Sequence, residues 1–390
     1  MATGRYNYLT ASVQSVKPRI LSRTFEKVFK YTKDLAGTNP IVVSLPNPEP
    51  CTYGPHVDVT QARVAYGRWG IPLLIKDLES EDPDVVSKAI NTLADLIHNP
   101  EKTFEAIRHN IVEHVAELML DEEQEVRERC ASIVTTIASQ GVGREAIIDN
   151  EVLIDNLKEL MMDDADDVRL RAGEALEMIC RSVDGASALL DADILTSILD
   201  DLQDEYNDDV MLLLLRTLEH LLGEEHAATE AVGVGVIDVL WQALDHRRPD
   251  VVAMTASCVA AVLATAAGKE DAETRDYFMM SVARGLRSQD RNVLTKTITA
   301  LQFFSVHVQP RKELLDLGVL PKMVQLATNP VDKELQIAAI KVATNLAEVP
   351  EGRSYLLRRH ITELEHMGGL EDEAVARHAA TLVRVIRWKP

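Results

Sequence analysis

Apolar residues recur along this chain of 390 residues with a period near 42. The positions that mark the period, here called anchors, are Val85, Val126, Val168, Val210, Val251, Val293, Leu335 and Val375. The positions eight and eleven residues after each anchor are also apolar in every unit. Because offsets 0, 4, 8 and 11 lie on one face of an α-helix, each unit is predicted to contain an amphipathic helix that needs a neighbour to cover it.

A second helix is predicted in front of this long helix. The position eleven residues before each anchor is apolar in all eight units, from Leu74 to Leu364. Acidic stretches such as residues 79–84 separate the two helices, and carboxylates there favour the N-terminus of the helix that follows. A Gly-Arg pair at residues 143–144 recurs at 352–353 and marks the joint between units. We expect the glycine to end the long helix and the basic residue to open a short helix of the next unit.

A period near 42 with one short and two longer helices is typical of armadillo and HEAT repeats. We therefore predict an all-α fold, an armadillo/HEAT-type right-handed superhelical solenoid of about eight repeats, over residues 59–390. The third helices of such an array line a concave groove. Residues 311–347 resemble an armadillo repeat in detail.

Residues 1–58 lie outside the repeats and form a separate arm, with seven Lys or Arg against four Asp or Glu. A helix within residues 18–37 would place Leu21, Phe25, Val28 and Phe29 close to one face, and five prolines make residues 39–55 extended. Three interpretations compete: a cap on the first repeat, a docking arm for another subunit, and an acid-poor transit peptide. We favour the docking arm.

The net charge of −21 argues against nucleic acid or an anionic membrane as the main partner, since both require an excess of Lys and Arg. The four cysteines form no CxxC pair and are expected to be reduced, buried thiols of a cytosolic protein. Residues 251–268 carry no charge but are rich in Ala, Thr and Ser. We interpret them as the long helix of the fifth unit and not as a membrane span.

No motif of an enzyme or a cofactor site is recognisable. The stretch 232–236, VGVGV, lacks the third glycine of a nucleotide loop, and the histidines show no HExxH spacing. Gly-x-Ser-x-Gly is absent as well, although a triad assembled from distant positions would leave no such motif. We predict a non-enzymatic protein with no cofactor, no metal and no small-molecule substrate.

The predicted groove can be compared with that of nuclear-import adaptors, which carry Trp six residues after each anchor and Asn ten residues after it. The sixth positions here are Asn91, Ser132, Glu174, Arg216, Ser257, Thr299, Lys341 and Thr381. Among the tenth positions only Asn345 matches, so binding of nuclear-localisation peptides in that manner is disfavoured. The polar sixth positions still predict an exposed groove that binds an extended partner. Our candidate partner-binding residues are Asn91, Glu174, Arg216 and Lys341 in the groove, with Leu21, Phe25, Val28 and Phe29 in the arm.

Beyond the repeat pattern, the chain resembles the radial-spoke armadillo proteins of motile cilia, the radial spoke head 14 homolog family, over about residues 58–390. The resemblance rests on residues 62–101, on ASQGVGREAII at 138–148, on LAEVPEGRSYLL at 346–357 and on the terminal VIRWKP. The arm is longer than the family pattern, which leaves the paralogue open.

This resemblance implies a non-enzymatic structural subunit of the radial spoke, with other spoke proteins as partners. Its location would be the axoneme of cilia or flagella, within the cytoskeleton of the cytoplasm. No catalytic residue carries over. The alternative is a cytosolic armadillo adaptor that presents client peptides to an enzyme such as a phosphatase or a ligase.

Overall fold

The computed structural model describes residues 70–329, 332–369 and 372–388. Within these ranges the chain forms the helices α3 to α25 and one short 3-10 helix, and it has no strand. Contacts divide the chain into residues 1–62 and 63–390, and every described helix belongs to the second unit. The helix expected within residues 18–37 lies outside the described residues.

One long helix per repeat begins two residues before each anchor. These helices are α4 (Pro83–Leu96), α7 (Gln124–Ala138), α10 (Asp166–Cys180), α13 (Asp208–Leu221), α16 (Pro249–Ala264), α19 (Arg291–Phe304), α22 (Lys333–Leu346) and α25 (Glu373–Ile386). Acidic turns start several of them as predicted, because the side chains of Asp82, Asp290, Asp332 and Asp372 accept hydrogen bonds from backbone N–H groups in the first turn.

Two shorter helices precede each long helix, except that the first repeat begins at α3. The second helices of the repeats are α3 (Gly70–Leu78), α6 (Ile111–Leu118), α9 (Glu151–Met161), α12 (Ile194–Asp204), α15 (Val236–Ala243), α18 (Phe278–Arg284), α21 (Val319–Ala327) and α24 (Ile361–Met367). The first helices are α5 (Pro100–Ile107), α8 (Gly141–Ile148), α11 (Val183–Asp191), α14 (Glu225–Gly233), α17 (Ala266–Glu273), α20 (Val308–Asp316) and α23 (Pro350–Arg359). The 3-10 helix η3 (Gly285–Arg287) follows α18.

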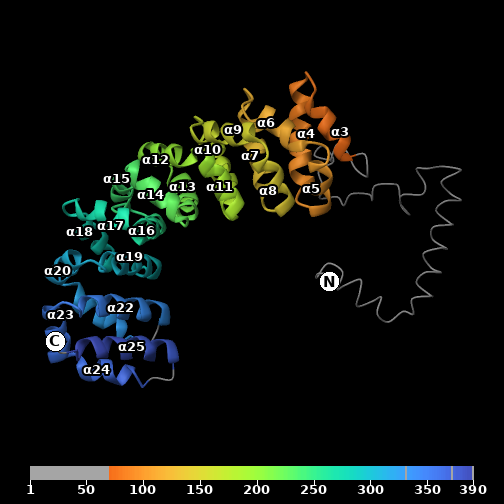
Figure 1. Ribbon diagram of the computed structural model, residues 1–390. Coiled ribbons are helices and arrows are strands. Elements are labelled where there is room, and N and C mark those ends of the chain that lie inside the picture. Colours follow the sequence, from red (N-terminus) through yellow and green to blue (C-terminus); the bar gives the residue numbers. More distant parts are fainter. Residues whose placement is uncertain (1–69, 330–331, 370–371, 389–390) are drawn as a thin grey trace, which may run out of the picture. The chain divides into compact units, whose positions relative to one another are not determined.

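The described helices stack in chain order (Figure 1), and the apolar core lies between them. Each long helix packs against the second helix of its own repeat and against the long helix of the next repeat. All eight residues that lie eleven positions before an anchor are buried. The anchors are buried too, apart from half-buried Val85 in the first repeat. The prediction of an all-helical repeat fold is therefore confirmed, including the face of each long helix that turns inward.

The joint between repeats differs from the prediction in the role of its glycine. Gly143 and Gly352 do not end the long helices but lie inside the first turn of α8 and α23. A Cβ atom at Gly352 would stand 2.2 Å from the carbonyl oxygen of Leu346, so the glycine allows two backbones to approach closely. Arg144 lies near the start of the short helix α8, as expected, and it also caps the long helix before it. Its Nη1 atom donates to the carbonyl oxygen of Ala138, the last residue of α7, at 2.7 Å, and a cation is favourable at a helix C-terminus.

The uncharged segment 251–268 is not one helix, which corrects part of our interpretation. The long helix α16 ends at Ala264, and α17 begins at Ala266 after a turn of 109°. No single described helix is long and apolar enough to cross a membrane, and this bent pair passes such a test only by length and composition. The side chain of Thr265 caps the new helix by accepting a hydrogen bond from Gly268 N–H, which explains the break.

Candidate protein-binding face

The eight sixth positions all lie on long helices, one on each from α4 to α25. We call this row of residues, Asn91, Ser132, Glu174, Arg216, Ser257, Thr299, Lys341 and Thr381, together with the polar side chains bonded to them, the long-helix face. Seven of the eight are half-buried, and only Ser257 is buried. The structure therefore places the four predicted groove residues on a common, partly exposed surface, and their binding role stays a prediction.

Polar contacts connect the long-helix face from one helix to the next. Asn91 Nδ2 on α4 donates to Glu125 Oε1 on α7 at 3.0 Å. Glu174 on α10 pairs with Arg171 of the same helix at 2.8 Å, and Arg171 also lies 3.6 Å from Glu128 on α7. Exposed ion pairs of this kind contribute about 0.2–1 kcal/mol each, so a partner can displace them at little cost.

A second group of contacts continues the row. Arg216 on α13 lies 3.8 Å from Glu177 on α10, with 42% of its side chain exposed. Lys296 Nζ on α19 is 3.2 Å from Glu219 Oε1 and donates to Ser257 Oγ at 2.8 Å, so three long helices share one polar cluster. Periodicity alone did not reveal this cluster, because Glu219 and Lys296 stand at different offsets from their anchors.

Charge changes sign along the repeats. Residues 70–276 contain 46 acidic and 16 basic residues, a net charge of −30, whereas residues 277–390 contain 12 acidic and 16 basic residues. On the last two long helices, Lys341 and Arg377 stand close to the half-buried His378. Burial first, and then these two cations, lower the pKa of His378 below its usual value. The N-terminal repeats are therefore strongly acidic, whereas the C-terminal repeats carry a small excess of basic residues.

The four candidate residues of the arm, Leu21, Phe25, Val28 and Phe29, lie outside the described residues. Among the described residues no group of three or more His, Cys, Asp or Glu side chains is arranged to hold a metal ion. Cys130, Cys180 and Cys258 are buried, and burial raises the pKa of each thiol, which disfavours the reactive thiolate.

Among the described carboxyl groups with a shifted pKa, Asp201 alone has its pKa raised. Burial, followed by the charges of Asp200 and Glu205, raises the pKa of Asp201 to about 6. Its Oδ2 atom is buried and has no hydrogen-bond partner within the part of the chain that the structure describes. No nucleophile accompanies it among the residues that line the adjoining pocket, which are mainly acidic. The raised pKa of Asp201 makes the stability of the folded chain depend on pH.

Comparison with known proteins gives one family model and similar solved structures. The model of a family described as non-SMC mitotic condensation complex subunit 1 matches residues 102–264, from α5 to α16. A crystal structure of an engineered protein is similar over 82% of this chain and 89% of its own, with a TM-score of 0.64 and 19% identity. Two further engineered proteins each cover 60% of this chain, with TM-scores of 0.55 and identities of 21% and 19%; the matches span 96% and 98% of their own lengths.

At these identities the solved structures show the fold alone. Neither the family description nor the three titles name a radial spoke, so that assignment stays a prediction. What the repeats, the packing and the comparisons show together is that this chain is a helical-repeat protein with the HEAT/armadillo type of solenoid, an architecture of the scaffold kind.

Proposed function

We propose that this chain is a non-enzymatic scaffold that binds partner proteins along its long-helix face. The observation that carries the proposal is the row of mostly half-buried polar side chains on the long helices, whose contacts connect one helix to the next from α4 to α19. Solenoids use such extended surfaces to hold elongated partners, because each repeat adds one segment to the same surface. The net charge of −30 over residues 70–276 favours protein partners over the phosphate backbone of nucleic acids.

We further propose that the assembly is the radial spoke of motile cilia or flagella, with other spoke proteins as partners. The support is the resemblance of four stretches. In the structure, residues 70–101 form the first repeat, 138–148 the joint between α7 and α8, and 346–357 the joint between α22 and α23. Two of these stretches, 138–148 and 346–357, are joints in which a glycine lets two helix backbones pack closely, so their likeness reflects structure. The stretch 62–101 and the terminal VIRWKP are more distinctive of the family.

The family match supports a second candidate, a subunit of a complex like the mitotic condensation complex. It covers residues 102–264, a strongly acidic part of the chain, and leaves the first repeat and the last three repeats outside. In both candidates the chain acts as a non-catalytic subunit of a large assembly, and the two differ in where that assembly is found.

Fractionation of ciliated cells separates the candidates. An epitope-tagged full-length chain is expressed in place of the native copy, the membranes are removed with detergent, and the axonemes are then washed with increasing salt. We expect the chain to remain with the axonemes after detergent treatment. Recovery in the detergent-soluble fraction would indicate the cytosolic adaptor, and recovery with chromosomes in dividing cells would indicate the second candidate; either result rejects the spoke proposal.

A further inference from the structure

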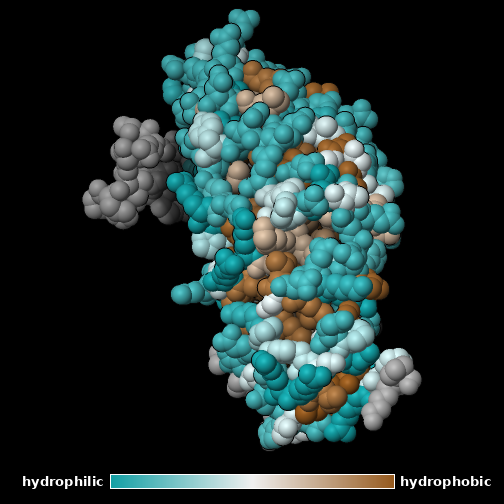
Figure 2. Space-filling view, turned by 90° about the vertical axis from the view of Figure 1, so that its left-hand side faces the viewer, coloured by the Kyte–Doolittle hydropathy of each residue, from teal (hydrophilic) through white to brown (hydrophobic). Residues whose placement is uncertain are grey.

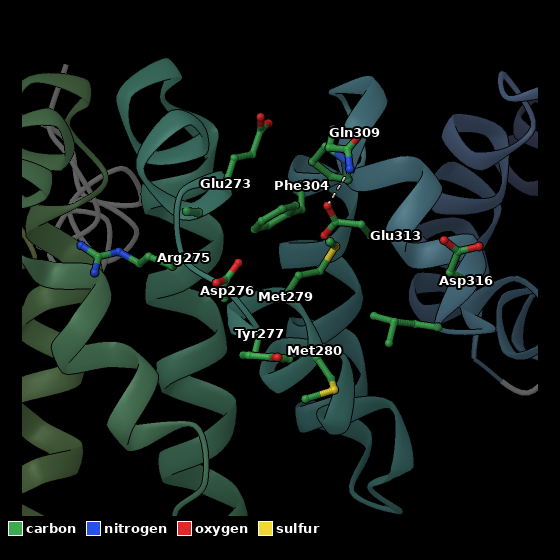
Figure 3. A pocket seen from close by; sticks show the side chains of 13 residues that line it. Glu273, Arg275, Asp276, Tyr277, Met279, Met280, Phe304, Gln309, Glu313 and Asp316 are labelled. Carbon is green, nitrogen blue, oxygen red and sulfur yellow. Dashed lines mark hydrogen bonds between the residues drawn. The ribbon is translucent and has the colours of Figure 1, made fainter.

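A cavity of about 510 Å³ lies where α17 and α18 meet α20 and the end of α19 (Figure 3). None of the sixth-position residues of the long-helix face lines it. Its apolar wall consists of Met279, Met280, Phe304, Pro310 and Leu317, and Phe304 lies at its centre in the close-up view. Pockets that bind ligands or side chains usually measure roughly 300–1,000 Å³, so this one has room for a bulky apolar group.

Tyr277 stands at the mouth of this cavity in an unusual backbone conformation. Its φ of 70° is in the left-handed region, which glycine, Asn and Asp adopt most readily. The corresponding joint in four other repeats carries those residue types, namely Asn110, Asp193, Gly235 and Gly318. Tyr277 is also 72% exposed, so burial does not offset the backbone strain. An aromatic residue kept in such a conformation points to a role at the surface.

The rim of the cavity is acidic. Glu273, Asp276, Glu313 and Asp316 are exposed around it. The one cation among the lining residues, Arg275, extends away from the cavity in Figure 3 and is held by Asp271 at 3.0 Å and by Asp238.

One of the four rim carboxylates has a basic partner, since Glu273 Oε1 lies 2.5 Å from His307 Nδ1. Within the described residues Asp276 and Asp316 form no ion pair, and Glu313 only accepts a hydrogen bond from Gln309 at 3.1 Å. The rim therefore presents uncompensated negative charge next to an apolar cavity.

The same side of the molecule shows further apolar surface. Figure 2 looks at the side that carries α18, α20 and α23 and shows apolar atoms exposed between polar ridges in its middle and lower part. On a chain whose polar surface is strongly charged, an apolar hollow with a charged rim is the arrangement expected of a protein-binding site, with an apolar centre and a polar surround.

We propose that this cavity is a second docking site, for a segment of a partner protein in which a bulky apolar side chain is flanked by Lys or Arg. The apolar side chain enters between Met279, Met280 and Phe304, Tyr277 packs along the segment, and the flanking cations meet Asp276, Glu313 and Asp316. The choice of occupant rests on charge complementarity, since an acidic segment would be repelled by the rim. This site is independent of the long-helix face, so the chain can hold two partners, or two parts of one, at once.

The test uses the full-length chain and a fluorescein-labelled nine-residue peptide with a central phenylalanine and lysines on both sides, measured by fluorescence polarisation. A peptide with glycine in place of the phenylalanine is the control for non-specific attraction to an acidic protein. Because burying an aromatic side chain contributes roughly 1.5–3 kcal/mol, we expect this control peptide to bind at least about tenfold more weakly. Equal affinity of the two peptides would overturn the proposal.

Variants locate the bound peptide. Asp316→Lys is expected to weaken binding several-fold, whereas Glu117→Lys, an equal charge change at an exposed position on α6, is expected to leave it unchanged. Tyr277→Asn is expected to weaken binding without lowering the melting temperature, because asparagine accepts the left-handed backbone. Equal losses for Asp316→Lys and Glu117→Lys would show attraction to total charge only and would overturn the proposal.

Methyl NMR supplies a readout that does not depend on mutation. With methionine methyl groups labelled, the peptide is expected to shift the signals of Met279 and Met280. The long helices carry their own half-buried reporters, Met178, Met211 and Met254. Shifts confined to these long-helix methionines would place the peptide on the other face and contradict this proposal, while leaving the proposed scaffold function intact.

Discussion

Single residues decide how closely successive repeats pack. Gly143, Gly185, Gly268 and Gly352 occupy the same place in four joints, and at each a Cβ atom would stand 2.1–2.2 Å from a carbonyl oxygen of the preceding long helix. The sequence revealed the Gly-Arg pair by its recurrence. It did not reveal why glycine is needed, because the close approach involves the backbone of a different helix.

Gly352→Ala is expected to destabilise the protein. The added methyl group meets backbone atoms of Leu346, which cannot rotate away as a side chain can, and overpacking of this kind costs typically about 1–3 kcal/mol. Gly141→Ala is the matched control, because nothing lies within 4 Å of its Cβ position. Thermal unfolding followed by circular dichroism measures both, and a melting temperature of Gly352→Ala equal to that of Gly141→Ala would contradict the close approach.

Asp201 makes stability depend on pH. Because its folded pKa of about 6 is raised above the unfolded value, the native state holds a proton that the unfolded state has lost. Its contribution to stability is therefore largest at low pH and falls as the pH rises from about 4 through about 6.

Asp201→Asn is expected to raise the melting temperature at pH 7 and to change it little at pH 4, because the amide removes the buried charge. Melting curves between these pH values test this directly. A variant that is less stable than the parent at pH 7 would show that the ionised carboxylate has a favourable partner.

At the scale of helices, the sequence predicted most of the arrangement. The period of apolar positions placed an anchor residue in every long helix and selected the buried face of the helix, because each long helix contacts the same two kinds of neighbour in every repeat. What periodicity missed lies in irregular positions: the turn at Thr265, the left-handed joint at Tyr277 and the ion pairs that bind one repeat to the next.

One such ion pair is almost fully buried. Arg169, one residue after its anchor on α10, pairs with Glu205 at 2.9 Å, with 8% and 4% of their side chains exposed. Its guanidinium also donates to the carbonyl oxygen of Asp163 at 2.8 Å, so it connects the start of α10 to the end of the following α12. The hydrogen bond to Glu205 raises the pKa of Arg169, which stays charged.

Arg169→Ala is expected to destabilise the array by about 3–5 kcal/mol, because Glu205 would remain buried without its partner. Arg171→Ala is the control on the same helix, since its side chain is 38% exposed and its pairs with Glu128 and Glu174 lie at the surface. Chemical denaturation measures the difference. Similar losses for the two variants would contradict the view that burial, and not the number of ion pairs, sets their contribution.

For the whole molecule, the sequence predicted the fold class and the presence of a partly exposed polar face. It did not predict the docking cavity, because Met279, Phe304 and Pro310 belong to three helices and carry no common spacing. The distribution of charge can be counted from the sequence alone. That the acidic and the basic repeats belong to one continuous array follows from the packing of successive long helices.

The arm is tested by truncation. A chain that begins at Asp58 lacks Leu21, Phe25, Val28 and Phe29 and is expected to melt like the full-length chain, yet to fail to join the assembly in cells without the native copy. The reason is that a docking arm contributes to the bound state only, whereas a cap would contribute to stability in isolation. A lowered melting temperature of the purified truncated chain would indicate a cap.

The central claim is that the long-helix face binds partner proteins, and charge reversal on that face tests it most directly. A triple variant with Glu174→Arg, Arg216→Glu and Lys341→Glu is compared with a control of equal net charge on the shorter helices, Glu117→Arg, Lys76→Glu and Arg287→Glu, whose residues are exposed. Both tagged chains are purified from ciliated cells, and the proteins that accompany them are quantified by mass spectrometry. The account predicts that the first variant melts normally but loses its partners, while the control keeps them; full retention of partners by the first variant would contradict it.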